Sequence, residues 1–520
     1  MAGIACKCLH GKSDQSGVAA SGHALEVLLG RLLFCLFADD TGIFQPAQSF
    51  RDFVEERTSP DGSDLGPRLA QLFQVLNTPT NQRSKRIDEQ LSQFAYINGK
   101  LFEETLPMAD FDPDMREALL DASALDWSAI SPAIFGSLFQ SIMDDQTRRH
   151  LGAHYTSEAN ILKVIQPLFM DELTQEFEGI TRQPAKLEAF HNKLCRINLF
   201  DPACGCGNFL VIGYRELRKL EMRVLRARHE LSDHKGQRTL DVHALIGVNV
   251  DQFYGIEIEE FPAQIAQVAL WLVDHQMNMR VSEEFGLYFA RIPLTRSPGI
   301  RHANALQIDW NDVLPAERCS HVLGNPPFLG KKEQSPDQKA DFERVMNHIK
   351  GFGILDFVSA WYVKSVRYLR GVESQNSPRA AFVSTNSITQ GEQVAVLWGE
   401  MQRLGMHIQF AHRTFQWSNE ASGNAAVHCV IVGFGPEDQA FKTIHEYEDI
   451  KGQPHAVNAK RINAYLVDAP DVLLSKRRAP ICKVPEMTNG SKPTDGGNLL
   501  MNEVEKDALI AIEPNAVKWI

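Results

Sequence analysis

The sequence lacks the features that mark several large classes of protein. It has no uninterrupted apolar run of 18 residues, so no membrane-spanning helix is expected. Its first residues, MAGIACKCLHGKSDQSG, contain no apolar core of a secretory signal. The 9 cysteines include no C-x-x-C pair, which favours reduced thiols in a cytoplasm over a disulfide framework.

Positive charge is also scarce. The chain carries 53 basic and 65 acidic residues, for a net charge of −12. Dedicated nucleic-acid binders are usually basic, so any contact with DNA must use a local basic face or a further domain. With 520 residues, of which 44% are hydrophobic, the chain is long enough for about two to four globular domains.

The pattern of apolar residues changes near residue 151. Before it, apolar residues recur at helical spacing, which predicts an all-helical domain over residues 1–150. Over residues 151–435, short apolar strands alternate with helices, which predicts a Rossmann-like, doubly wound α/β sheet that binds ligands at the carboxyl ends of its strands. Residues 436–520 are expected to form a connector. The strand candidates are 197–200, 254–258, 321–324, 380–385, 407–412 and 427–434.

A glycine-rich turn, 201-DPACGCG-207, follows the first strand candidate. The two cysteines have no second Cys/His pair at ligand spacing, so we expect no metal site. The G-K-[ST] ending of a phosphate-binding loop is missing, and the G-x-G-x-x-G dinucleotide pattern is incomplete. What remains is a strand, a tight turn and a helix that let a ligand approach the backbone. The carboxylate of Asp201 suits a cationic ligand, although a plain turn without a ligand fits this motif equally well.

Another acid, Glu257, ends the next strand candidate. A carboxylate at that point can accept hydrogen bonds from both hydroxyls of a ribose. The two acids are 56 residues apart, which exceeds the usual spacing of about 20. Taken alone, Glu257 is better explained as an ordinary solvated acid at a strand end.

The motif 325-NPPF-328 follows an apolar strand candidate. Two prolines stiffen the backbone there, and Pro326 favours an extended conformation for Asn325. The Asn325 amide oxygen and a neighbouring carbonyl can then both face one NH₂ group, with the flat ring of Phe328 beside them. This arrangement suits a planar substrate that carries an amino group, such as a nucleobase.

The motifs together resemble those of the amino-methyltransferases of DNA, in the order of the γ class that makes N6-methyladenine. Residues 20–520 are most similar to the MmeI-like, type IIL restriction–modification polypeptides, with specific matches in IFGSLFQ, RRHLGAHYTS and WSNEASGNAAV. The motifs that carry the resemblance are 154-HYTSEANI-161, 201-DPACGCGNFL-210, 255-GIEIEE-260, 303-ANAL-306, 325-NPPF-328, 356-DFVSAW-361 and 411-AHRTFQWSNEASGNAAVHCVIVGF-434.

The resemblance implies a class I fold that uses S-adenosylmethionine as methyl donor and double-stranded DNA as partner. It implies that the cofactor is bound by Tyr155, Thr156, Ser157, Asp201, Ala203, Gly205, Gly207, Glu257, Ile258, Asn304, Ala305 and Asp356. It also implies that the catalytic clamp consists of Asn325, Pro326, Pro327 and Phe328. Phe415 or Trp417 would cover the second face of the flipped base, and we favour Phe415.

Other interpretations stay open at this point. The same clamp would serve a methyltransferase that acts on an RNA base or a protein glutamine, or the chain could be a DNA-binding subunit without catalysis. A nicotinamide-dependent oxidoreductase is disfavoured by the incomplete glycine pattern. The P-D…E-x-K nuclease of the family's long forms has no match here. We also expect the chain to stop where the family's target-recognition domain would begin.

Overall fold

The computed structural model describes residues 22–97, 100–128, 156–231, 246–285, 297–370, 378–417, 427–477, 482–484 and 501–518. It divides into two units, residues 1–474 and residues 475–520. The first unit contains one sheet, whose strands are β1 (Leu199–Asp201), β2 (Phe253–Glu257), β3 (Gly299–His302), β4 (His321–Gly324), β5 (Arg379–Thr385), β6 (His407–Trp417), β7 (Val427–Gly435), β8 (Lys442–Glu446) and β9 (His455–Ala459).

The strand order is β3-β2-β1-β4-β5-β7-β6-β8-β9. The run from β3 to β5 is parallel, and β7 is antiparallel to both β5 and β6. This order confirms the doubly wound α/β sheet predicted from the sequence. Strands β8 and β9 extend the sheet past residue 435, where the sequence analysis began a connector.

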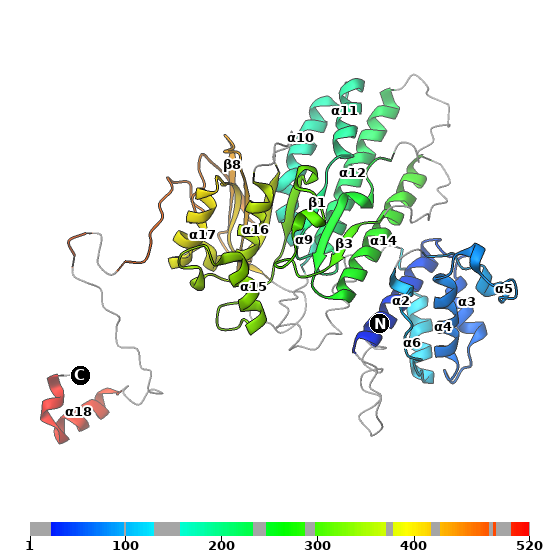
Figure 1. The fold of residues 1–520 in the computed structure, drawn as a ribbon, viewed down its shortest axis with the longest axis horizontal. Helices are drawn as coiled ribbons and strands as arrows, with labels where there is room; N and C mark the ends of the chain where they lie inside the picture. The colour runs from blue at the N-terminus through cyan, green and yellow to red at the C-terminus, as the bar shows by residue number, and fades with distance from the viewer. Residues whose placement is uncertain are drawn as a thin grey trace. The chain divides into compact units, whose positions relative to one another are not determined.

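The strands alternate their side chains between two apolar layers. In β1, Leu199 joins one buried cluster and Phe200 the other, and Leu323 and Val322 of β4 divide in the same way. Helices therefore cover both faces of the sheet (Figure 1). One layer contains α9 (Glu158–Ile165), α10 (Asp171–Ile180), α11 (Pro184–Leu194), α12 (Asn208–Leu231) and α14 (Glu260–Phe285), with a π-helical turn at Gln166–Met170 between α9 and α10. The other contains α15 (Pro336–Met346), α16 (Ser359–Leu369) and α17 (Gly391–Arg403).

A helical region precedes the sheet. Its helices are α2 (Gly22–Asp40), α3 (Ser49–Arg57), α4 (Leu65–Leu76), α5 (Glu89–Ser92) and α6 (Pro113–Ser123). Each regular element described between residues 22 and 128 is an α-helix or a short 3₁₀ turn, in agreement with the predicted helical domain.

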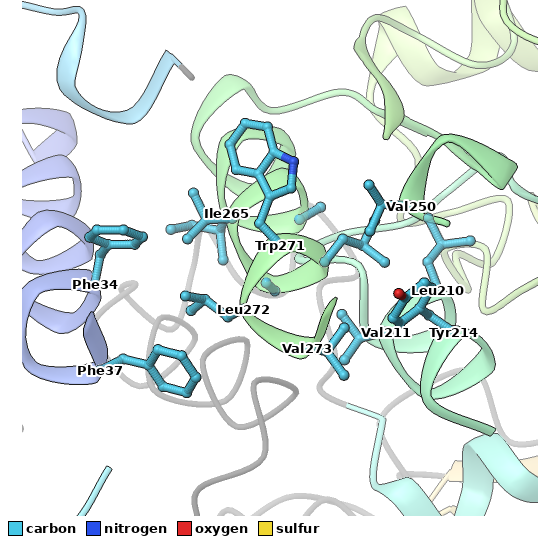
Figure 2. Packing of buried hydrophobic residues seen from close by; sticks show 14 of the residues in the cluster. Phe34, Phe37, Leu210, Val211, Tyr214, Val250, Ile265, Trp271, Leu272 and Val273 are labelled. Atoms are coloured by element: carbon cyan, nitrogen blue, oxygen red, sulfur yellow. The ribbon is translucent and has the colours of Figure 1, made fainter. Parts of the chain in front are cut away.

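The helical region packs on α14 through apolar side chains. Phe34 and Phe37 of α2 approach Ile265 and Leu272 of α14 (Figure 2). Gly30 allows this close approach, because a Cβ there would lie 3.3 Å from Ile265 Cδ1. The opposite side of α14 packs on α12, so α14 is covered by apolar neighbours on both sides.

A buried arginine joins α12 to α14. Arg218 is fully buried, and its guanidinium contacts Asp274 at 3.1 Å and Glu221 at 3.1 Å. Its Nη2 donates to Asn278 Oδ1 at 2.9 Å. This network pairs the buried guanidinium with one carboxylate from each of the two helices.

The second unit contains α18 (Glu503–Ile512), whose first turn is capped reciprocally by Asn502 and Glu505. Across the described ranges of both units, no helix combines the length and the apolar character that crossing a bilayer requires.

Candidate active site

Three strand ends meet at one edge of the sheet. β1 ends at Asp201, β2 at Glu257 and β4 at Gly324, and β1 lies between the other two. The strands are parallel, so their carboxyl ends share an edge. A Cβ added at Gly324 would stand only 2.5 Å from Asp201 Oδ1. The residue before Asn325 therefore lies directly against the acid of the glycine turn, and the structure brings the two motifs together.

Asp201 is a fully buried carboxyl group. Its Oδ1 accepts the Ala203 N–H at 3.0 Å, whereas its Oδ2 has no hydrogen-bond partner among the residues that the structure describes. Burial raises the pKa of Asp201 to about 8, and the nearby charge of Glu257 adds to the rise. A cationic group bound against Oδ2 would relieve this cost of burial.

The glycine turn leaves room above the strand ends. Gly205 has φ +55°, and a Cβ there would meet no atom within 4 Å. Gly207 has φ +82°, and a Cβ there would lie 2.9 Å from the Ala266 Cβ on α14. The first glycine therefore gives open access, and the second allows the close packing that holds the turn in place.

Glu257 is tied to the same turn. Its Oε2 accepts the Gly205 N–H at 2.8 Å and its Oε1 accepts the Glu259 N–H at 3.1 Å. Burial raises the pKa of this carboxyl group above its ordinary value. The next residue, Ile258, is apolar but 51% exposed, so it offers an apolar surface beside the turn.

Asn325 presents its amide oxygen as an unused acceptor. The Asn325 Nδ2 donates to Thr156 Oγ1 at 3.2 Å, and Thr156 is only 4% exposed. The Asn325 Oδ1 is buried, and no hydrogen-bond partner is described for it. Such a group normally costs free energy unless a ligand supplies the donor.

Pro326, Pro327 and Phe328 complete the group of residues at this edge of the sheet, which we call the corner. Pro326 is buried and Pro327 half-buried. Phe328 is also half-buried and packs against both apolar clusters, where the two layers meet beyond the strand ends. The following loop is fixed because Leu329 O accepts the Phe357 N–H at 3.1 Å.

Asn304 and Ala305 lie beside the end of β2, since Ala303 N donates to Glu257 O at 2.8 Å. The Asn304 Nδ2 is held by Asp341 Oδ2 at 2.7 Å. Ala305 is 6% exposed and belongs to the core. Ala305 therefore does not present the open surface that its predicted place at the adenine edge would need.

Asp356 lies shortly before α16, and its carboxylate is beside the last residue of β5. Its Oδ2 accepts hydrogen bonds from Ser387 Oγ and, at 2.7 Å, from Thr385 Oγ1. Its Oδ1 accepts from Gln393 Nε2 at 3.4 Å. The carboxylate is thus held by the protein itself, and its predicted contact with the ligands stays a prediction.

The structure does not support Phe415 as the second face of a base pocket. Phe415 is 1% exposed, and its ring stacks on Tyr447 with centroids 5.2 Å apart. The Lys163 ammonium lies 4.4 Å from the centroid of the same ring. No face of Phe415 is open to a base, because these neighbours cover it.

Two further predicted residues cannot be placed. Tyr155 lies outside the described residues, as does the side chain of Trp417, whose backbone ends β6. Ser157 immediately precedes α9 and is half-buried.

Asn208 was not singled out by the sequence analysis. It opens α12 directly after the glycine turn, and its Oδ1 is buried with no partner in the described part of the chain. It is a second candidate acceptor next to Asp201. An asparagine at the start of a helix is so common that its position alone gives no signal.

A cluster of potential metal ligands occurs elsewhere, at His191, Cys195 and Glu221. Glu221 Oε1 already accepts from Gly247 N at 2.7 Å and from Val248 N at 2.9 Å. Burial raises the pKa of Cys195 to about 11, which keeps the thiol protonated. The adjacent guanidinium of Arg218 would repel a cation, so this cluster is a structural hydrogen-bond network.

The corner as a whole fits a cationic nucleoside cofactor. Asp201 offers a buried acceptor, Gly205 open space, Glu257 a carboxylate at the second strand end and Ile258 an apolar surface. Together with the strand order, this site defines a class I S-adenosylmethionine-dependent methyltransferase.

Comparison with known proteins assigns the family. The family model described as "MmeI, DNA-methyltransferase domain" matches residues 177–446, and the MmeI helicase spacer domain matches residues 23–102. The type IIL restriction–modification enzyme MmeI, solved in complex with DNA, is 58% identical with a TM-score of 0.87 over 100% of this chain and 67% of that chain. DNA methyltransferase A of Bacillus subtilis (strain 168) is 38% identical over 510 residues, which are 97% of this chain and 56% of the relative.

The chain therefore belongs to the MmeI family, and its cofactor is S-adenosylmethionine. It spans 56% of the length of the curated B. subtilis relative.

The comparison also corrects one expectation. The MmeI target recognition domain matches residues 468–520, so the prediction that this domain is absent was wrong. That stretch gave no signal because its scattered prolines and glycines resemble a linker.

Proposed function

We propose that this protein transfers the methyl group of S-adenosylmethionine to N6 of an adenine flipped out of double-stranded DNA, as the modification part of a restriction–modification system. The observation that supports the proposal most directly is the Asn325 Oδ1. It is a buried acceptor without a described partner, and the preceding residue contacts Asp201. Methyl transfer to an amino group needs an oxygen that accepts a hydrogen bond from the amine, placed beside the site of a cationic methyl donor.

The cofactor supplies a methyl group made electrophilic by a sulfonium centre. Asp201 Oδ2 would accept from the methionine ammonium, and Glu257 would accept from the ribose hydroxyls. Ile258 would pack against the adenine ring through its exposed surface. These three residues would hold the cofactor at the edge of the sheet where β1 and β2 end.

Asn325 and Pro326 would hold the amino group that is methylated. The Asn325 Oδ1 and the Pro326 carbonyl oxygen would each accept one N6 hydrogen. Two acceptors placed below the ring plane favour a pyramidal nitrogen, whose lone pair is no longer delocalised into the ring. That lone pair would attack the methyl carbon as the carbon–sulfur bond breaks, so that the sulfonium leaves as a neutral thioether and the methylated nitrogen gives up one proton to water. Holding the reactants in line can provide effective molarities of ~10⁵ M or more.

The adenine must leave the duplex to reach this corner. Stacking on the ring of Phe328 would offset the cost of unstacking by about 1–3 kcal/mol. Lys331 and Lys332 follow the motif, are exposed and can contact phosphates.

The net charge of −12 limits the DNA-binding surface to local basic groups and to the recognition domain. Such an enzyme acts on DNA in the bacterial cytoplasm. Free cysteines among the described residues are compatible with that compartment.

A methyl-transfer assay on the full-length protein tests the proposal. Labelled S-adenosylmethionine is offered with duplex DNA, RNA and protein, and the modified nucleoside is identified. N6-methyladenine in DNA is the expected product, and labelling confined to RNA or protein would contradict the choice of substrate. N325A should lose methyl transfer while it binds the cofactor with nearly normal affinity. Parallel loss of both would contradict the role given to Asn325.

A further inference from the structure

We propose that Thr156 is a positioning residue for the Asn325 amide, whereas the family resemblance implied only a contact with the cofactor. This inference rests on the function proposed above and adds to it the group that orients the amine clamp. It stands on the contact between Asn325 Nδ2 and Thr156 Oγ1 at 3.2 Å, on the burial of Thr156 and on the buried Asn325 Oδ1, for which no partner is described.

An asparagine amide has two ends of nearly equal shape but opposite hydrogen-bonding character. Its oxygen accepts, and its NH₂ group donates. Only the oxygen can hold a substrate amino group, so a reversed amide would present hydrogens to hydrogens. The clamp therefore needs an acceptor for the NH₂ group in the orientation that presents the oxygen to the substrate.

Thr156 is placed to accept a hydrogen bond from the NH₂ group when the amide oxygen is turned away from it. Its hydroxyl oxygen accepts the Asn325 NH₂ group on the side away from the unused Oδ1. A threonine hydroxyl can also donate, so Thr156 does not forbid the reversed amide. Its contribution is an acceptor for the buried NH₂ group in the productive orientation, which otherwise would have its donor unsatisfied.

The position of Thr156 in the fold supports this role. It precedes α9, and α9 packs against β5, which is next to β4 in the sheet order, and against β7, which follows β5. With 4% exposure, its hydroxyl is shielded from water that could replace it. The contact links two segments that are 169 residues apart in sequence.

The test compares T156V with T156S in the full-length protein. T156V keeps the volume of the side chain and removes the acceptor, whereas T156S keeps the hydroxyl. We expect T156V to lower the single-turnover rate of methyl transfer by about 5- to 150-fold, the range for a buried donor that loses its partner. Its dissociation constant for S-adenosylmethionine should stay within about twofold of the wild-type value, and T156S should recover most of the lost rate.

A matched control separates this effect from a general loss of stability. Thr41 is similarly buried, at 6% exposure, and its hydroxyl donates to Phe37 O at 2.8 Å in the helical region. T41V removes a buried hydroxyl of the same kind and should leave the transfer rate unchanged. If T156V does not fold, T156S and T156A form a second pair that differs by one oxygen.

Two outcomes would overturn the proposal. The first is that T156V binds the cofactor more weakly in proportion to its loss of rate, which would assign Thr156 to the cofactor alone. The second is that T156V or T156A keeps the full rate. Failure of the proposed function is distinguishable, because the wild-type protein would then transfer no methyl group to DNA. If it methylates another amino group, the same comparison is made with that substrate.

Discussion

The carboxylate of Asp201 lies directly against the backbone of Gly324, with room for a hydrogen but none for a methyl group. A Cβ at Gly324 would stand 2.5 Å from Asp201 Oδ1 and 3.1 Å from its Cγ. The cofactor end of the site and the amine clamp therefore share one van der Waals contact.

Substitution at Gly324 should damage both ends of the site. We expect G324A to displace Asp201, to destabilise the fold by about 1–3 kcal/mol and to weaken cofactor binding. Thermal unfolding and cofactor titration measure the two effects. G330A is the matched control, because its added Cβ would meet its nearest atom at 3.9 Å. Normal cofactor binding by G324A would contradict the contact.

Cofactor affinity should rise with pH because Asp201 must lose its proton to receive an ammonium group. Its pKa is raised to about 8, so at neutral pH most of the free protein holds the proton. Between pH 6 and 7.5 we expect the dissociation constant to fall by up to about tenfold per pH unit, with release of a proton on binding. Calorimetry in buffers of different ionisation enthalpy measures that release. D201N should bind weakly without this pH dependence, and an equal slope in D201N would exclude Asp201 as the source.

The same carboxyl group should make the free protein less stable as the pH rises. The folded state keeps the Asp201 proton up to about pH 8, whereas an ordinary aspartate loses it near 3.8. The stability that this difference contributes is present below pH 3.8 and is lost as the pH rises to about 8. Denaturant unfolding of the wild type and D201N between pH 5 and 8 checks the sign. Asp201 is excluded as the cause if stability in the wild type does not fall more steeply than in D201N.

Removal of the buried arginine should be costly. R218M would leave Glu221 and Asp274 without the guanidinium between α12 and α14, and we expect a loss of about 3–5 kcal/mol in the free energy of unfolding. Arg226 offers a control on the same helix, since it pairs with Glu284 of α14 but is 53% exposed. R226M should cost about 1 kcal/mol or less. Comparable losses from both variants would show that burial does not set the energy of these pairs.

Truncation of Phe328 and truncation of Phe415 should have different effects. F328A should weaken capture of the flipped base by about 1–3 kcal/mol with little effect on folding, measured by the fluorescence of 2-aminopurine at the target position. F415A should instead destabilise the protein by about 3–5 kcal/mol, because Phe415 is 1% exposed. A folded F415A that has lost only base capture would restore Phe415 to the base pocket.

The motifs were predictable because special residues mark them. Asp201 and Asn325 follow apolar strand candidates and Glu257 lies near the end of another, and parallel strands bring such ends together. Strands β3, β8 and β9 were missed because they are short and mostly polar or exposed, with too little apolar sequence to indicate a buried face.

The side on which Phe415 lies could not be read from the sequence. The pairing of β6 with β7 shifts register between His412 and Phe415, and such an irregularity moves the following side chains to the other face. The buried amide oxygens of Asn208 and Asn325, for which no hydrogen-bond partner is described, could not be predicted either, because hydrogen-bond partners depend on the three-dimensional structure.

The position of α14 has a consequence for how this protein can be divided. α14 starts at Glu260, shortly after Glu257, and buries Ile265 and Leu272 against the phenylalanines of α2. Separating the spacer segment from the methyltransferase segment would expose the apolar side chains of α14 that pack on α2. We therefore expect the methyltransferase segment to be unstable when it is produced without the helical region that covers α14.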